Sequence, residues 1–200
     1  MELTSKDATP LSKDSEYLIA PGANLSSPAG APELTLRAAI DRLARSGARG
    51  MRVSRFFRTP CFPPGAGPDY VNAAARLRLD GGPRRMLDLL HAVEDEFGRK
   101  RVRRWGQRTL DLDLLAAGGQ VAPDRATHDR WRELPPESRI AHTPDRLILP
   151  HPRLQDRAFV LVPLADVAPQ WRHPVLAVTV REMLAALPPG ALAEVVPLPG

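Results

Sequence analysis

The stretch Tyr70-Val71-Asn72-Ala73-Ala74-Ala75-Arg76-Leu77-Arg78-Leu79 alternates between apolar and polar side chains. Successive side chains of a β-strand point to opposite faces, so a strand here collects its apolar residues on one face. That face carries Val71, Ala73, Ala75, Leu77 and Leu79, and the other carries Tyr70, Asn72, Arg76 and Arg78. The stretch therefore predicts a strand with one face on the core and one polar face.

Strands and helices alternate around this stretch. Apolar residues at helical spacing, preceded by proline and closed by glycine, predict two amphipathic helices. In chain order the segments are a strand at Tyr17–Ala20, a helix at Glu33–Ser46, a strand at Met51–Phe57, the strand at Tyr70–Leu79, a helix from Pro83 to Gly98, and a strand at Thr109–Leu115. This β-α-β-β-α-β order predicts an α+β fold of the ferredoxin-like sandwich type.

The segments that follow predict additions to this sandwich. Leu147–Leu149 and Phe159–Val162 are apolar runs, and Thr179-Val180-Arg181-Glu182 has the spacing of a capping box that begins a helix. We therefore expect an additional C-terminal strand and helices. Residues 119–145 are rich in Asp, Arg, His and Pro, carry the isolated Trp131 and lack a sustained period. They predict a surface insertion that is weakly coupled to the core and dispensable for folding.

Length and composition predict one domain. Two hundred residues that are 43% hydrophobic can bury one real core. We expect a disordered leader at 1–15, a single domain at 16–190 that includes the insertion, and a tail at 191–200. The single cysteine, Cys61, excludes an internal disulfide framework and a zinc site of several cysteines. The leader has no apolar stretch, so we expect neither a signal peptide nor a membrane span. We expect a cytoplasmic monomer that makes no membrane contact.

Two carboxylates stand one residue apart in Leu110-Asp111-Leu112-Asp113-Leu114. On a strand, both aspartates face one way and the leucines anchor the other face. Alpha carbons two residues apart are roughly 6.6 Å from each other, so the carboxylates can share one ion or bracket a pair of ions. Two carboxylates together with substrate phosphates suit magnesium. Taken alone, such a pair is more often an ordinary exposed strand face.

A basic cluster lies directly upstream of these aspartates, and the whole chain has a formal charge of +5. The cluster contains Arg99, Lys100, Arg101, Arg103, Arg104 and Arg108. A charge run of this kind can be a solvated surface or a nucleic-acid patch. Cations beside metal-binding carboxylates favour instead a site for a polyphosphate such as ATP.

The segment from Arg104 to Asp113, Arg-Trp-Gly-Gln-Arg-Thr-Leu-Asp-Leu-Asp, resembles the signature of the 6-hydroxymethyl-7,8-dihydropterin pyrophosphokinase family. This family is also called 2-amino-4-hydroxy-6-hydroxymethyldihydropteridine diphosphokinase. Further segments resemble it in the same order, over about Tyr17 to Leu187: Gly22–Leu25, Arg58–Pro60, Asp69–Ala73, Gly98–Arg99, Leu149–Arg153 and Arg157–Leu161. The resemblance implies transfer of pyrophosphate from ATP to a hydroxymethyl pterin in folate biosynthesis.

The resemblance also implies roles for individual residues. Asp111 and Asp113 would hold two Mg²⁺ ions, and Arg99, Arg108, Asp111 and Asp113 would form the catalytic set. ATP would be surrounded by Glu94, Arg99, Arg101, Arg104, Trp105, Arg108, Arg146, Ile148, His151 and Arg157. The pterin would contact Gly22, Thr59, Pro60, Phe62, Tyr70, Asn72, Trp105, Asp111 and Phe159, with its ring between Phe62 and Phe159. The partners implied are these two small molecules, without nucleic acid.

Three positions depart from the family pattern. Gln107 replaces a proline, which removes a fixed φ from the loop that bears Trp105. Ala23 replaces a serine, and Ile148 can offer only backbone groups to an adenine. Ala23 and Gln107, and separately the aspartate pair with its basic cluster, leave two alternatives open. One is a catalytically degenerate homologue that binds pterin or ATP, and the other is a metal-dependent nuclease or nucleic-acid-binding protein.

Overall fold

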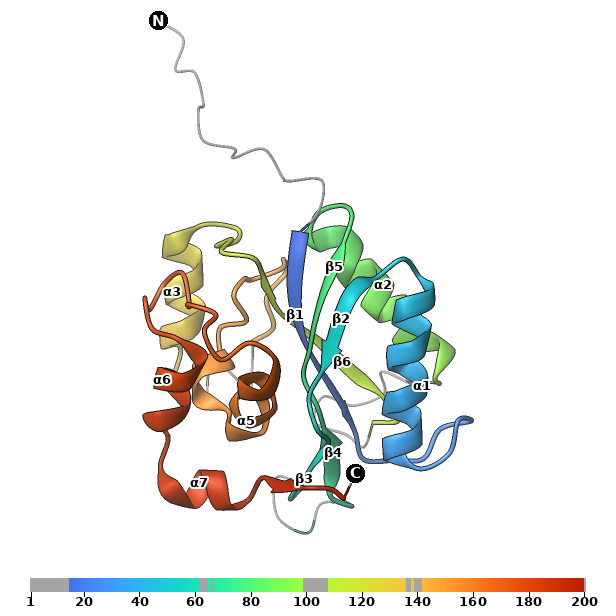
Figure 1. The fold of residues 1–200 in the computed structure, drawn as a ribbon. Coiled ribbons are helices and arrows are strands. Elements are labelled where there is room, and N and C mark those ends of the chain that lie inside the picture. Colours follow the sequence, from blue (N-terminus) through green and yellow to red (C-terminus); the bar gives the residue numbers. More distant parts are fainter. Residues whose placement is uncertain are drawn as a thin grey trace, which may run out of the picture.

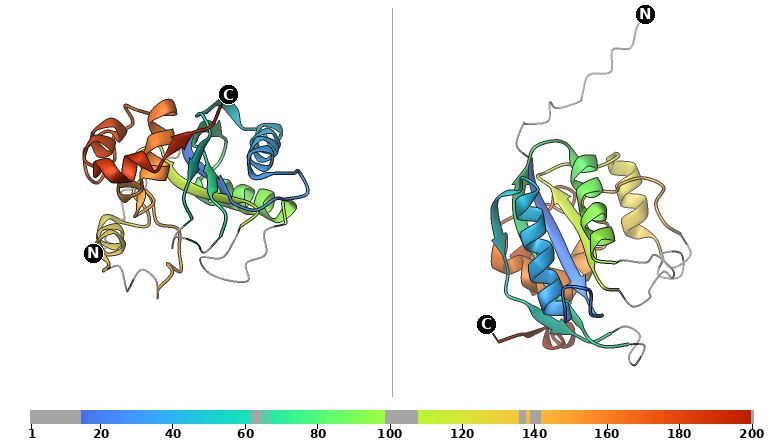
Figure 2. Two further views of the ribbon diagram at one scale, coloured as in Figure 1. Left: turned by 90° about the horizontal axis from the view of Figure 1, so that it is seen from below. Right: turned by 90° about the vertical axis from the view of Figure 1, so that its right-hand side faces the viewer.

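The computed structural model describes residues 15–61, 65, 67–98, 108–135, 138 and 142–199. Within them, an antiparallel sheet lies between two helical layers (Figures 1 and 2). One face is covered by α1 (Pro32–Arg45) and α2 (Pro83–Glu96). The other is covered by α5 (Ala158–Val167) and α6 (Val180–Ala185), with α3 (Arg125–Glu133) beside them. The fold is therefore mixed α/β.

The described strands are β1 (Ser15–Ala23), β2 (Arg49–Val53), β3 (Phe57–Thr59), β4 (Tyr70–Asn72), β5 (Ala75–Leu79), β6 (Asp111–Ala117) and β7 (Val196–Pro197). Their order is β2-β5-β1-β4-β3-β7, with β6 paired to β1, and the pairings are antiparallel. The long β1 is therefore central. It pairs with β5 along its first half, with β4 at its end and with β6 on the other edge.

The stretch at 70–79 forms two strands, so the prediction of one continuous strand is wrong in this detail. Ala73 and Ala74 separate β4 from β5, and both are fully buried. The backbone of the break stays satisfied, because Ala73 N–H donates to the Pro21 carbonyl at 2.9 Å and Ala74 N–H donates to Ser54 Oγ at 2.9 Å. The register of β4 with β1 continues that of β5, so the chain passes through the break without leaving these buried donors unpaired.

Both predicted amphipathic helices are confirmed. Each begins with proline in its first turn, where the missing N–H has no helical partner to lose. The capping box is also confirmed: Thr179 caps α6 and exchanges hydrogen bonds with Glu182. The apolar run at Phe159–Val162 lies in α5 rather than in a strand, and Leu149 forms only an isolated bridge with Ala122.

Two other boundaries differ from the sequence prediction. Ser15, assigned above to the leader, is the first residue of β1 and is buried. Residues 119–145, expected to be a weakly coupled surface insertion, include the helix α3. This helix is capped by the Asp124 side chain and carries His128, whose side chain is fully buried. The remaining short elements are η1 (Leu154–Asp156) and α7 (Pro189–Ala193).

No helix in the described ranges is both long and apolar enough to span a membrane.

Candidate functional site

The two aspartates of β6 project from one face of the strand. Leu112 and Leu114 are 3% and 5% exposed and pack in the core under α1 and α2. The alternation of the strand therefore turns Asp111 and Asp113 to the opposite face, where their side chains are 21% and 36% exposed. The prediction that leucines anchor the strand beneath the carboxylates is confirmed.

A β-bulge ends this alternation just beyond Asp113. Ile19 of β1 pairs with Leu114 and Leu18 pairs with Ala116, so Leu115 is the extra residue. Leu115 and Ala116 consequently both pack on the α5 and α6 side. The polar face is thus confined to the beginning of β6.

Glu94 supports the strand from behind. It lies on α2, is 1% exposed, and accepts a hydrogen bond at 2.7 Å from the N–H of Leu112, the residue between the two aspartates. The resemblance placed Glu94 around ATP. Its burial and its bond to the backbone give it a structural position under the strand, and its contact with ATP stays a prediction.

Each aspartate is paired with an arginine. An Arg108 Nη1–H donates to Asp111 Oδ2, and Arg157 Nη1 lies 3.4 Å from Asp113 Oδ2. Burial acts to lower the pKa of Arg108, but the carboxylate of Asp111 outweighs it, so this pKa is raised. The face is therefore lined by two fixed cations and two carboxylates, a combination suited to a metal-bound polyphosphate.

Asn24 positions Arg108, and the sequence analysis did not single it out. Its side chain is 2% exposed, and Asn24 Oδ1 accepts the Arg108 N–H at 2.9 Å. In return the Arg108 carbonyl accepts the Asn24 N–H at 3.1 Å. An asparagine directly after Gly22-Ala23 was the available signal, because asparagine commonly bonds to nearby backbone at strand ends.

The predicted pterin contacts of four neighbouring strands, β6, β1, β4 and β3, lie side by side. Gly22 is the register partner of Asn72 on β4 and of Asp111 on β6. A Cβ atom on Gly22 would stand 2.8 Å from Asn72 Oδ1, so only glycine fits there without displacing the amide. Asn72 Nδ2–H donates to Thr59 Oγ1 at 2.7 Å. The structure thus places the residues predicted to contact the pterin directly beside Asp111.

Tyr70 and Pro60 extend this edge. Tyr70 is the register partner of Thr59, and Pro60 follows Thr59 in the chain with an exposed side chain. Burial raises the pKa of the Tyr70 hydroxyl, while the nearby Arg108 acts to lower it. At neutral pH Tyr70 is therefore protonated, so its hydroxyl beside the aspartate face is able to donate a hydrogen bond.

The last two segments of the family resemblance, Leu149–Arg153 and Arg157–Leu161, lie on the other side of the aspartate face. His151 N–H donates to the Leu115 carbonyl at 2.7 Å, and its Nδ1 accepts the Arg153 N–H at 3.1 Å. Burial, together with the cations Arg157 and Arg153, holds the pKa of His151 well below its ordinary value. The imidazole is therefore neutral at pH 7 with its proton on Nε2, where it can donate to a ligand.

Phe159 is 39% exposed, and the Arg157 guanidinium carbon lies 5.6 Å from the centre of its ring. An exposed aromatic ring at this position suits stacking on a flat ligand. Ile148 is 5% exposed, so its side chain serves the core.

Arg146 occupies a separate setting. It pairs with its neighbour Asp145 and lines a hollow of about 430 Å³ beside α3. The hollow is also lined by Thr127, Arg130, Trp131, Leu134, Ser138 and His142. The structure therefore groups Arg146 with the insertion, while Arg108 and Arg157 stand at the aspartates.

Five predicted site residues lie outside the described residues: Phe62, Arg99, Arg101, Arg104 and Trp105. Gln107 does as well. Their roles stay predictions.

Magnesium fits the donor set of β6 in chemistry. Within the described ranges, no group of three or more His, Cys, Asp or Glu side chains forms a metal cluster. A magnesium ion bound with a nucleotide needs only one or two protein carboxylates, because phosphates and waters complete its shell. Asp111 and Asp113 supply two such groups on one partly exposed face.

Known proteins resemble this chain over most of its length. The model of the family described as 7,8-dihydro-6-hydroxymethylpterin-pyrophosphokinase (HPPK) matches residues 18–169. Two relatives carry the name 2-amino-4-hydroxy-6-hydroxymethyldihydropteridine pyrophosphokinase. One, from Synechocystis sp., is 39% identical over 150 residues, which are 74% of this chain and 66% of the relative. The other, from Pseudomonas aeruginosa, is 38% identical over 157 residues, which are 78% of this chain and 82% of the relative.

A solved structure shares the fold. The wild-type HPPK-DHPS of Plasmodium falciparum with pteroate superposes with a TM-score of 0.62 at 12% identity. The superposition covers 89% of this chain and 43% of that chain, so this protein spans less than half of the solved one. At this identity the likeness concerns the fold.

Proposed function

This chain belongs to the 7,8-dihydro-6-hydroxymethylpterin-pyrophosphokinase family, and on that premise we propose that it transfers pyrophosphate from ATP to 6-hydroxymethyl-7,8-dihydropterin. The products are AMP and the pterin diphosphate, and the step belongs to folate biosynthesis. One observation carries the proposal. Asp111 and Asp113 share a partly exposed strand face, each against an arginine, and the pterin-edge residue Gly22 pairs directly with Asp111.

Asp111 and Asp113 would hold two magnesium ions together with the phosphates of ATP. The ions, when bound, supply charge neutralisation and polarise the phosphoryl oxygens. When ATP binds, the arginines would move from the carboxylates to phosphate oxygens. Guanidinium groups can bind phosphate in the same forked geometry in which they bind carboxylate. Arg108 and Arg157, with Arg99 and Arg101, would then take the charge of the triphosphate.

The chain's main contribution is to orient two substrates. Asn72, Thr59 and Tyr70 offer hydrogen bonds to the edge of a pterin, and Phe159, with Phe62, offers ring faces. The hydroxymethyl oxygen would attack the β-phosphorus in line while the bond from that phosphorus to the oxygen of AMP breaks, and the hydroxyl proton would pass to solvent. Positioning and charge stabilisation would supply most of the acceleration. We assign no side chain as a general base. Trp105 and the loop around it would exclude water.

We also propose that the sheet is a ferredoxin-like one. The pairing order β6-β1-β5-β2 with α1 and α2 on one face supports this assignment. In that description β4 continues the pairing of β5 with β1, and β3, and then β7, add further strands next to β4. The monomeric state and the cytoplasmic location stay predictions.

The deciding experiment is incubation of the protein with ATP, magnesium and 6-hydroxymethyl-7,8-dihydropterin, followed by separation of AMP from ADP. We expect AMP in equal amount to the pterin diphosphate. Formation of ADP would indicate single phosphoryl transfer and contradict the proposal. Tight binding of either substrate without product would select the degenerate homologue. Binding of DNA or RNA with a steep salt dependence and no AMP would select a nucleic-acid function.

A further inference from the structure

One peptide unit, between Pro150 and His151, is held at both ends. Its N–H, from His151, donates to the Leu115 carbonyl on β6 at 2.7 Å. Its carbonyl, on Pro150, lies 3.1 Å from Nε2 of His128 on α3. The peptide therefore links the strand that carries Asp113 to the helix of the insertion.

The direction of the second bond follows from its acceptor. A carbonyl oxygen can only accept, so His128 Nε2 must carry the proton. The His128 side chain is fully buried, and burial lowers its pKa, which keeps the ring neutral at pH 7. Without this donor the Pro150 carbonyl would lose its hydrogen-bond partner in a buried setting, which is unfavourable.

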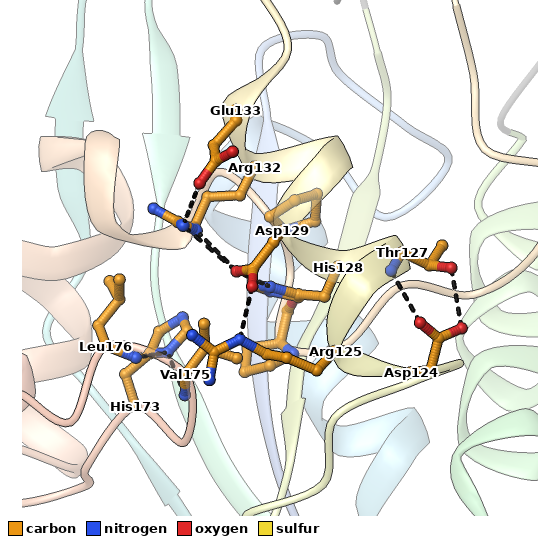
Figure 3. A network of polar contacts seen from close by, with 12 residues as sticks. Asp124, Arg125, Thr127, His128, Asp129, Arg132, Glu133, His173, Val175 and Leu176 are labelled. Atoms are coloured by element: carbon orange, nitrogen blue, oxygen red, sulfur yellow. Dashed lines mark hydrogen bonds and ion pairs between the residues drawn. The ribbon is translucent and has the colours of Figure 1, made fainter.

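The histidine is fixed on its own helix. Asp124 caps α3 by accepting the Thr127 N–H at 2.8 Å, and Asp129 pairs with Arg125 and Arg132 on the same helix (Figure 3). These contacts hold the helix that presents the donor.

The ring of His128 is fixed from a second side. It packs edge-on against His173, with ring centres 5.9 Å apart. His173 in turn accepts the N–H groups of Val175 and Leu176 at 3.2 Å each (Figure 3). The donor therefore sits in a rigid, buried setting between α3 and the C-terminal layer.

The peptide that His128 holds belongs to the segment proposed to bind ATP. His151 begins at this peptide, and its ring orientation depends on the next turn, where Arg153 N–H donates to Nδ1. On the other side Leu149 exchanges two backbone hydrogen bonds with Ala122, at 2.9 and 3.0 Å, at the start of the insertion. Two points of the insertion, Ala122 and His128, are thus connected to the backbone that presents His151.

We propose that His128 is a positioning residue for ATP: through the Pro150 carbonyl it sets the place of His151 against β6. The insertion is on this view a built-in support of the nucleotide side of the site. The inference rests on the proposed function, because it assumes that His151 contacts ATP. It predicts that loss of the bond weakens ATP binding while the pterin side, on β1, β3 and β4, is unaffected.

The test compares His128→Leu, which keeps apolar volume without a donor, with His128→Gln, whose amide N–H can reach the same carbonyl. Steady-state AMP formation gives KM for ATP, KM for the pterin and kcat, and hydrogen exchange reports the His151 amide. We expect His128→Leu to raise KM for ATP about fivefold or more, to change KM for the pterin less than twofold, and to speed exchange at His151. His128→Gln should recover most of the ATP affinity.

Asp124→Ala is the matched control, because it removes the cap of the same helix and leaves His128 in place. It should lower the melting temperature while KM for ATP changes less than twofold. An unchanged KM for ATP in His128→Leu, or an equal rise in Asp124→Ala, would overturn the inference. A wild-type protein that forms no AMP would instead defeat the proposed function, and unchanged His151 exchange in His128→Leu would separately defeat the positioning contact.

Discussion

The two ends of β6 have opposite electrostatic surroundings. At its beginning, Asp111 and Asp113 remain partly exposed and charged, each against an arginine. Just past its last residue, the Gly118 carbonyl accepts the Trp171 Nε1–H at 3.0 Å, and Trp171 packs against the buried His173. The first end keeps charges accessible, whereas the second end buries neutral rings.

Because of this difference, one end of β6 is suited to bind a ligand and the other end is suited to support the insertion. Paired charges at a partly exposed face can exchange their partners for a ligand at modest cost, since water still screens them. Buried imidazoles lose that freedom, because burial disfavours their charged form. The charged end is therefore suited to bind a polyphosphate, and the neutral end is suited to hold the insertion in place. The predictions below test whether the two ends can be altered independently.

The largest expected effect is at the charged end. Asp113→Ala should lower the rate of AMP formation by about a thousandfold or more, because several kcal/mol of transition-state stabilisation depend on the bound metal. The melting temperature should change little, since the Asp113 side chain is 36% exposed. The rate is measured from AMP release and the fold from circular dichroism.

Asp80→Ala is the matched control. Asp80 forms an exposed ion pair with Arg49 on the far side of β5, with side chains that are 53% exposed in both partners. Its removal should leave AMP formation unchanged. Turnover retained in Asp113→Ala would sink the metal assignment.

The sequence could predict the charged end because its signals are local. Alternation from Leu110 to Leu114 determines which side chains share a face, and this holds in the structure. Helix starts and the capping box at Thr179 were predictable for the same reason, since they depend on neighbours within four residues.

The neutral end could not be predicted because its contacts are between distant residues. His128 and His173 are 45 positions apart in numbering, and each looks like an ordinary loop histidine in the sequence. The sequence of the short α3 shows no apolar face, because the residue that this helix buries is a histidine rather than a leucine. Similarly, the backbone N–H groups between β4 and β5 donate to Pro21 and Ser54, which are distant in the chain and which no local pattern indicates.

The next effect concerns the middle of the strand. Glu94→Ala should lower the free energy of unfolding by about 1–3 kcal/mol, because the buried Leu112 N–H loses its acceptor. Glu94→Gln keeps an acceptor oxygen and should lose less. Urea unfolding measures both. Equal stability of the alanine variant and the wild type would show that Glu94 is not the support of β6.

Acid should weaken the neutral end before the charged end. Burial, followed by the charges of His128, Arg132 and Arg125, lowers the pKa of His173 from 6.5 to about 4. The unfolded chain therefore binds a proton more readily than the folded one. Stability is complete above pH 6.5 and falls as the pH drops toward 4.

From pH 7 to pH 5 this histidine should cost about 1–2 kcal/mol of the free energy of unfolding. His173→Asn offers an oxygen to the same two backbone donors and does not titrate. Its unfolding, measured by urea at both pH values, should therefore show a smaller loss than the wild type. An identical loss in both proteins would assign the acid sensitivity elsewhere.

The smallest effect should come from the cap of α6. Thr179 Oγ1 accepts the Glu182 N–H at 3.2 Å, and Glu182 Oε2 accepts the Thr179 N–H at 2.6 Å. Val180 N–H then donates to the Trp171 carbonyl at 3.0 Å, so the cap closes the loop that carries His173. Thr179→Ala should cost about 1 kcal/mol of the free energy of unfolding, and Thr179→Ser should cost less.

The activity of Thr179→Ala shows whether the two ends of β6 are coupled. If the neutral end only supports the insertion, a cap loss of about 1 kcal/mol leaves His128 in place in nearly every folded molecule. KM for ATP and the rate of AMP formation in Thr179→Ala should then match the wild type at 25 °C, and should separate from it only near the melting temperature. A raised KM for ATP well below that temperature would mean that the cap of α6 already acts on the nucleotide side, and that the two ends of β6 are coupled in the folded state.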